Sequence, residues 1–159
     1  MRTALLVSIV AASGATAGVT SFQAVIDNDL SGTPSPAAGM LTGEYDDVAN
    51  TFSFSYEISD ELIGTPAAPG AHLHNAPAGS NGPIVFAFAT GEWDLSGAFV
   101  WSGLTAGQVD ELFAGNIYAN FHTTDYPGGE VRGQITVVPA PAGLGLLGLA
   151  GLGVTRRRR

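Results

Sequence analysis

The stretch NTFSFSYEIS, residues 50–59, alternates apolar and polar side chains along its whole length. Its apolar positions are Phe52, Phe54, Tyr56 and Ile58. Successive side chains of an extended chain point to opposite sides, so this pattern predicts a β-strand with one face buried in a core. The preceding segment, GMLTGEYD at residues 39–46, is joined to it by the turn-forming residues DVAN, which predicts an antiparallel hairpin.

Short apolar segments separated by Gly and Pro predict further strands on both sides of this hairpin. They are residues 22–26, 83–89, 97–103, 116–123 and 129–138. The run at 83–89 is continuously apolar, so we expect a buried strand there. Residues 105–116 instead place Val109, Leu112 and Phe113 at helical spacing after a capping Thr105, which predicts one short helix at about residues 105–114. Many short strands with one helix predict an all-β fold, a Greek-key sandwich or barrel.

The charge of the chain is strongly uneven along its 159 residues. Five of its six basic residues lie at the two ends, so Arg132 alone faces 14 acids in the intervening part, a formal charge of 1 − 14 = −13. Because phosphate binding requires Lys and Arg, this composition argues against nucleic acid as a partner. The chain has no cysteine, which excludes disulfides and thiol catalysis. The 120 or so residues between the ends suffice for one domain.

The N-terminus has the organisation of a secretory signal peptide. It carries Arg2, an apolar run at residues 4–12 and an A-x-A pattern at residues 15–17. We therefore expect residues 1–17 to be removed on export. The alternative, a membrane anchor, requires about 18 apolar residues, roughly twice the length of this run.

The C-terminus combines a Pro-containing motif, an apolar segment at residues 142–154, predicted to form a hydrophobic helix, and a basic end. This order resembles the PEP-CTERM sorting signal of bacterial surface proteins, with Ala140 where Glu is common. The matching residues are Val138, Pro139, Pro141, Ala142, Arg156, Arg157, Arg158 and Arg159. The resemblance implies that residues 138–159 are recognised by an exosortase-type enzyme and that the protein reaches the cell surface or the extracellular matrix. The alternative is a plain C-terminal membrane anchor, with the arginines kept on the cytoplasmic side.

Two segments between these ends, AHLHNAPAGSNGPIVFAF and LTAGQVDELFAGNIYANFHTTDYPGGEVRGQI, resemble the CHRD domain, first recognised in chordin. The matching positions are His72, His74, Gly79, Gly82, Pro83, Tyr118, Asn120, His122, Thr123, Pro127, Gly129, Glu130, Arg132, Gly133 and Gln134. The resemblance implies a CHRD domain at residues 18–137 with an immunoglobulin-like β-sandwich fold. It implies no defined catalytic activity.

The three histidines of the chain allow two interpretations. On a strand, His72 and His74 project from one face, and His122 projects from the face that Tyr118 and Asn120 share. If the two strands are neighbours, three imidazoles converge, and three nitrogens with an open position suit zinc or copper. Alternatively, each ring donates to loop backbone and orders the loops, with Glu130 and Arg132 as an internal ion pair.

These observations favour a non-enzymatic, exported structural or binding module at the cell surface. Its expected partners are the processing enzyme, the membrane through the C-terminal segment before processing, and extracellular polysaccharide or other matrix components. The alternative function is that of a copper- or zinc-binding protein, with possible redox activity, that uses His72, His74 and His122. Nothing in the sequence forms a nucleophile motif of a hydrolase.

Overall fold

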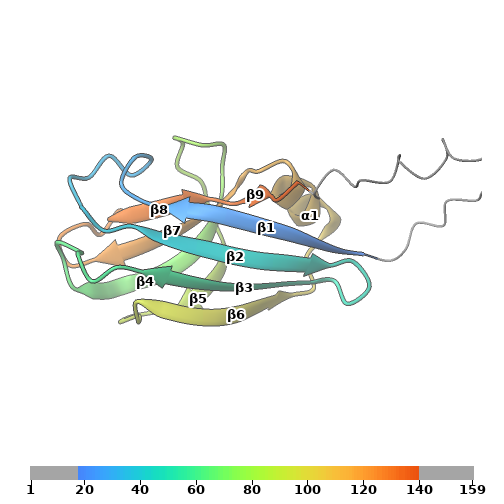
Figure 1. Cartoon of the computed structure of the whole chain (residues 1–159), viewed down its shortest axis with the longest axis horizontal. Helices are drawn as coiled ribbons and strands as arrows, with labels where there is room; N and C mark the ends of the chain where they lie inside the picture. The colour runs from blue at the N-terminus through green and yellow to red at the C-terminus, as the bar shows by residue number, and fades with distance from the viewer. Residues whose placement is uncertain (1–17, 140–159) are drawn as a thin grey trace, which may run out of the picture.

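Two antiparallel sheets packed face to face form the described part of the chain, residues 18–139 of a computed structural model (Figure 1). The elements are β1 (Val19–Ile26), β2 (Gly39–Asp46), β3 (Thr51–Ile58), β4 (Pro66–Asn75), β5 (Ile84–Ala89), β6 (Ser96–Ser102), α1 (Ala106–Phe113), β7 (Ile117–Thr123), β8 (Val131–Gln134) and β9 (Thr136–Val137). The predicted all-β sandwich with one short helix is confirmed. The predicted signal peptide at residues 1–17 and hydrophobic helix at residues 142–154 lie outside the described residues, within which no helix could cross a membrane.

The larger sheet has the strand order β6-β3-β2-β1-β9. The predicted hairpin is confirmed, because β2 and β3 pair in register from Gly39 opposite Ile58 to Asp46 opposite Thr51. Every apolar position of the alternating stretch in β3 is buried and every serine between them is exposed. β3 therefore presents an aromatic face to the core and a polar face to solvent.

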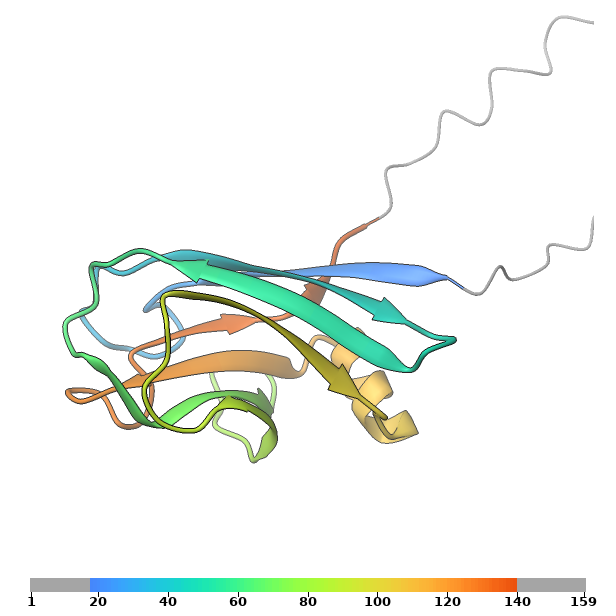
Figure 2. The same cartoon turned by 90° about the horizontal axis from the view of Figure 1, so that it is seen from below.

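The smaller sheet has the order β5-β4-β7-β8 and packs against the first as a second layer (Figure 2). The expectation that residues 83–89 form a buried strand is wrong, because no residue of β5 is fully buried. Ile84 is 52% exposed, and Phe86 and Phe88 are only partly buried. The reason is position, since β5 is an edge strand with β4 as its single neighbour and only part of each side is covered.

The predicted helix is confirmed, and its ends follow local rules. The Thr105 hydroxyl accepts the Gln108 backbone N–H, with Ala114 as the C-cap. Gly115 follows with φ +75°, a conformation that glycine adopts without strain. Leu112 is fully buried, whereas Phe113 is 44% exposed and packs edge-on against Phe22 at a centroid distance of 5.3 Å. The helix thus closes one end of the sandwich.

The chain passes between the sheets four times, at β3–β4, β5–β6, β6–β7 through α1, and β8–β9. A backbone bridge between Asp27 and Arg132 joins the end of β1 to β8 across one edge. Trp93 and Trp101 are 6% and 5% exposed and belong to the core. These crossings bring β4 and β7, which carry the histidines, side by side in the middle of the smaller sheet.

Candidate metal centre

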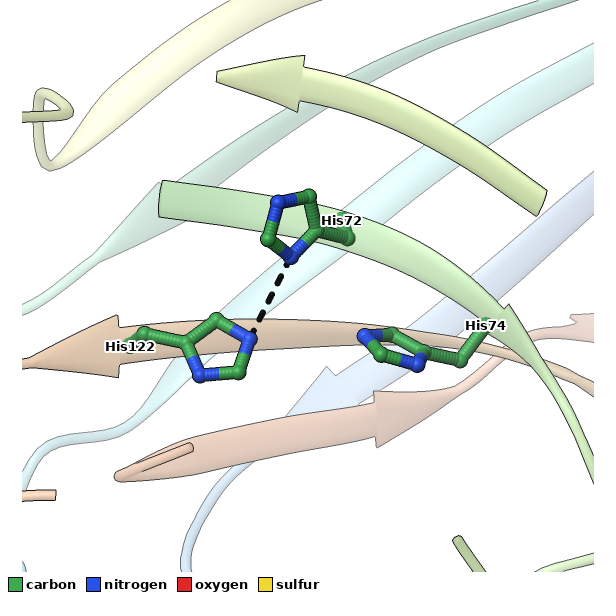
Figure 3. A group of neighbouring side chains, drawn as sticks. All are labelled: His72, His74 and His122. Atoms are coloured by element: carbon green, nitrogen blue, oxygen red, sulfur yellow. Dashed lines mark hydrogen bonds between the residues drawn. The ribbon is translucent and has the colours of Figure 1, made fainter. Parts of the chain in front are cut away.

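The histidines of β4 and β7 converge on the face of the smaller sheet that points away from the core. In the antiparallel register His72 lies opposite Asn120 and His74 opposite Tyr118, while Leu73 between them is fully buried in the core. One ring nitrogen from each of His72, His74 and His122 lies within 4.8 Å of the others. Figure 3 shows the three rings turned toward one another from two adjacent strands. The predicted cluster required the two histidine-bearing strands to be neighbours, and β4 and β7 are paired.

The His74 ring is oriented by the loop that follows β4. Its Nδ1 donates to the Gly82 carbonyl at 2.9 Å, which places the proton on Nδ1 because a carbonyl can only accept. The ring stacks on Tyr118 at 5.1 Å with an interplanar angle of 13°, and the Tyr118 hydroxyl accepts the Gly82 N–H at 3.2 Å. Nε2 therefore carries a lone pair, and it is buried without a hydrogen-bond partner among residues 18–139.

The His122 ring is oriented in the same way by the turn after β7. Its Nδ1 donates to the Pro127 carbonyl at 2.9 Å, so Nε2 again carries the lone pair. This Nε2 lies 3.3 Å from Nδ1 of His72 and 3.4 Å from the amide nitrogen of Asn120. In the tautomer of His72 with its proton on Nε2, three lone pairs face one small volume.

Burial keeps the three rings neutral near pH 7. Burial lowers the pKa of His72, His74 and His122 below the usual 6.5, and repulsion among the rings lowers that of His72 and His122 further. Backbone hydrogen bonds to the carbonyls of Pro69, Gly82 and Pro127 offset part of this effect. The neutral ring is the form that binds a metal ion. Orientation of an imidazole ring by a backbone carbonyl is also common among histidines that bind a metal ion.

The predicted ion pair between Glu130 and Arg132 is wrong. The Glu130 side chain is fully buried and its carboxylate accepts four hydrogen bonds. They come from the Ser35 hydroxyl at 2.6 Å, the Thr123 hydroxyl at 2.7 Å and the backbone N–H groups of Ile63 at 2.6 Å and Gly64 at 3.0 Å. Burial alone would raise the pKa of Glu130, but these donors outweigh it and the pKa lies below its usual value. The carboxylate thus ties three segments to the turn between β7 and β8.

Arg132 instead points along the face that carries the histidines. Its Nη1 donates to the Asn81 side-chain oxygen at 3.1 Å, and its guanidinium lies over the Tyr118 ring at 5.1 Å. Gln134, two residues on, donates to the carbonyls of Ala76 and Gly115 at 3.2 and 2.6 Å. Arg132 therefore lies beside the three histidines, while Gln134 holds the backbone at Ala76 and Gly115.

The remaining motif positions shape the two loops around the rings. A Cβ on Gly82 would collide with the Asn75 carbonyl, and one on Gly129, whose φ is +112°, would collide with the Asn120 side chain. The Pro83 carbonyl accepts the Asn75 N–H at 3.0 Å, whereas Gly79 lies at the exposed tip with φ +78°. A Cβ on Gly133 would meet the Val25 carbonyl at 2.6 Å. These positions are consistent with a scaffold for the loops.

Sequence reasoning missed several residues of this region. Ser35 and the backbone at residues 63–64 hold Glu130, and Asn81 holds Arg132, yet they lie in loops without periodicity that would predict such contacts. Trp93 lies in the core, and its indole N–H also donates to the His122 carbonyl at 2.7 Å. The one signal for this contact in the sequence is that the N–H of a buried Trp usually has a hydrogen-bond acceptor.

The residues of the predicted sorting signal fall at the end of the described chain. The Val138 N–H donates to the Ser21 carbonyl at 2.8 Å, and Pro139 is exposed. Pro141, Ala142 and the arginines at residues 156–159 lie outside the described residues.

The chain matches one family model, described as CHRD domain, over residues 22–135. The match covers both β-sheets up to Ile135, the helix and all three histidines. No curated protein matches the chain. Because the matched residues make up well over half of its length, the chain belongs to the CHRD domain family.

Proposed function

We propose that this protein is a binding module that holds one copper or zinc ion with His72 Nδ1, His74 Nε2 and His122 Nε2. The observation that carries the proposal is the buried Nε2 of His74, a lone pair without a partner that faces the other two rings. A buried acceptor left without a partner costs free energy, on the order of 1–3 kcal/mol. An ion coordinated at this point offsets that cost.

The donor set supports copper or zinc over other metals. Three neutral imidazole nitrogens suit both ions, whereas Ca²⁺ and Mg²⁺ prefer oxygen ligands. The described residues supply three ligands at the cluster, which leaves one position for a further molecule. The hydrogen bonds to Gly82 and Pro127 fit the structural interpretation equally well, and they are also the bonds that fix a ligand's orientation, so a loop-ordering role does not compete with metal binding.

We further propose that the module is exported, sorted by its C-terminal signal through an exosortase-type enzyme, and placed at the cell surface or in the matrix. Support comes from the sequences of the two ends and from the absence of lysine from a strongly acidic chain. Binding rather than turnover is the proposed activity, and extracellular polysaccharide is the proposed matrix partner.

Metal analysis tests the metal proposal with variants that separate the two roles of each ring. In H74N and H122N the asparagine amide can take the place of Nδ1 and keep the bond to Gly82 or Pro127, while the Nε2 ligand is lost. We expect the full-length chain, purified in detergent without chelator or affinity tag, to hold about one equivalent of copper or zinc after dialysis.

Both variants should keep the β-sheet circular dichroism spectrum and lose the bound ion. Retention of the ion by both variants, or no stoichiometric ion in the unmodified chain with either metal, would refute the site.

A further inference from the structure

Arg132 is the only cationic side chain between the two ends of the chain, and it is buried. Its side chain is 6% exposed, and among residues 18–139 its one hydrogen-bond partner is the neutral side-chain oxygen of Asn81. Its Nε is buried without any partner. Buried charges in proteins are normally paired, and a chain with 14 acids has many carboxylates to offer. The buried charge of Arg132 therefore lacks the negatively charged partner that such a charge normally has.

The unpaired guanidinium lies beside the three histidines. Arg132 on β8 lies directly opposite Asn120 on β7, and Asn120 lies opposite His72 on β4, so the three side chains form one row across the sheet. The Tyr118 ring contacts Arg132 and His74. The positive charge of Arg132 therefore lies on the same face of the sheet as the three rings.

Three buried side-chain nitrogen and oxygen atoms lack a hydrogen-bond partner in the described part of the chain, and all three belong to this region. They are His74 Nε2, Asn120 Oδ1 and Arg132 Nε. The first is a lone pair for a metal ion, the second an acceptor and the third a charged donor. Because Asn120 and Arg132 are cross-strand partners, their side chains lie on the same face of the smaller sheet.

We propose that the metal centre binds a small protonated oxyanion, of the class of hydrogencarbonate or hydrogenphosphate, in the position that the histidines leave open. One oxygen coordinates the ion, a second accepts the Arg132 Nε–H, and the hydroxyl donates to Asn120 Oδ1. The inference rests on the proposed metal site. Three neutral imidazoles leave the charge of a divalent ion and of Arg132 uncompensated, and an anion between them lowers this repulsion.

Removal of the Arg132 charge should lower the affinity for the anion without lowering the affinity for copper. Arg132 repels a divalent ion at the histidines, so R132Q should bind copper as tightly as the unmodified chain or more tightly. The same variant lacks the charge-assisted donor, so its affinity for the anion should fall by about tenfold or more. A purely structural Arg132, which only packs on Tyr118, predicts that both affinities fall together.

The test is a titration of the copper(II)-loaded, full-length chain with sodium hydrogencarbonate at constant pH, followed by the visible d–d absorption of copper. Sodium perchlorate holds the ionic strength constant, and copper stoichiometry is measured first for every variant. R132K is the matched control, because it keeps the charge but replaces the planar fork with a single ammonium. We expect the unmodified chain to bind hydrogencarbonate most tightly, R132K to be intermediate and R132Q to be weakest, with copper retained in all three.

The outcomes separate this inference from the metal proposal. Copper binding without a spectral response to hydrogencarbonate, or with equal anion affinity in the unmodified chain and R132Q, overturns the anion site and leaves the metal site standing. Loss of copper together with the anion in both variants assigns Arg132 a structural role and overturns the inference. Failure of the unmodified chain to hold copper or zinc overturns both proposals.

Discussion

Glu130→Gln should be among the most damaging single-atom replacements in this protein. The carboxylate is fully buried and accepts two hydroxyl and two backbone N–H donors. A glutamine keeps one oxygen and turns an NH₂ group toward two of these donors, so two bonds are lost and one backbone N–H is left without a partner. Bonds to a charged acceptor contribute about 1.5–3 kcal/mol each, and we expect a loss of about 3–5 kcal/mol in the free energy of unfolding.

Thermal unfolding followed by circular dichroism measures this loss. For a domain of this size about 3–5 kcal/mol corresponds to a fall in Tm of roughly 10–20 °C. Glu57→Gln, on the exposed face of β3, is the matched control and should change Tm by less than about 2 °C. The pKa of Glu130 is lowered in the fold, so its stabilisation is complete above the unfolded value of 4.5 and is lost as the pH falls through the lower, folded value. E130Q should lack this acid-dependent loss, and a fall in Tm as small as that of E57Q would refute the reasoning.

Three further predictions follow from the same contacts. Gly82→Ala forces a Cβ against the Asn75 carbonyl and should displace the loop that orients His74. We expect the free energy of unfolding, measured in urea, to fall by about 2 kcal/mol or more. In the control variant Gly107→Ala the new Cβ meets open space on α1, so this change should be neutral or stabilising. Thr105→Ala removes the helix cap and should cost about 1 kcal/mol in the same assay, and a loss below about 0.3 kcal/mol would contradict the cap. Because burial lowers the pKa of all three histidines, the unfolded chain binds more protons below about pH 6.5. The urea midpoint of the metal-free protein should therefore fall between pH 7 and 5, and should fall less in H74N, whereas equal slopes in the two proteins would contradict the buried neutral ring.

Local patterns predicted those parts of the molecule that depend on neighbours in sequence. The alternation in residues 50–59 predicted β3, and the spacing of His72 and His74 placed both rings on one face, because a strand has a period of two whatever it pairs with. The burial of β5 could not be predicted, because exposure depends on whether a strand lies at an edge. An apolar run looks the same in both places.

The contacts of Glu130 could not be predicted for a related reason. Alternation would place it on the face of Arg132, but it precedes β8 and follows Gly129, whose φ of +112° turns the chain. Three of its four donors come from loops 66 to 95 residues away in sequence, and the fourth, Thr123, is seven residues away. The sequence likewise contained the three histidines, but the pairing of β4 with β7 that unites them is a property of the whole fold.

The distance along the chain between the histidines would give the proposed metal centre a mechanical role. His72 and His122 are 50 residues apart in sequence, so an ion bound to both closes a large covalent-like loop in a chain that has no cysteine. The loop-closure estimate used for disulfides gives about 4 kcal/mol for a loop of this length, because the cross-link restricts the unfolded chain. A bound ion would thus act as a removable staple, and resistance of the protein to unfolding and proteolysis would rise and fall with the metal supply around it.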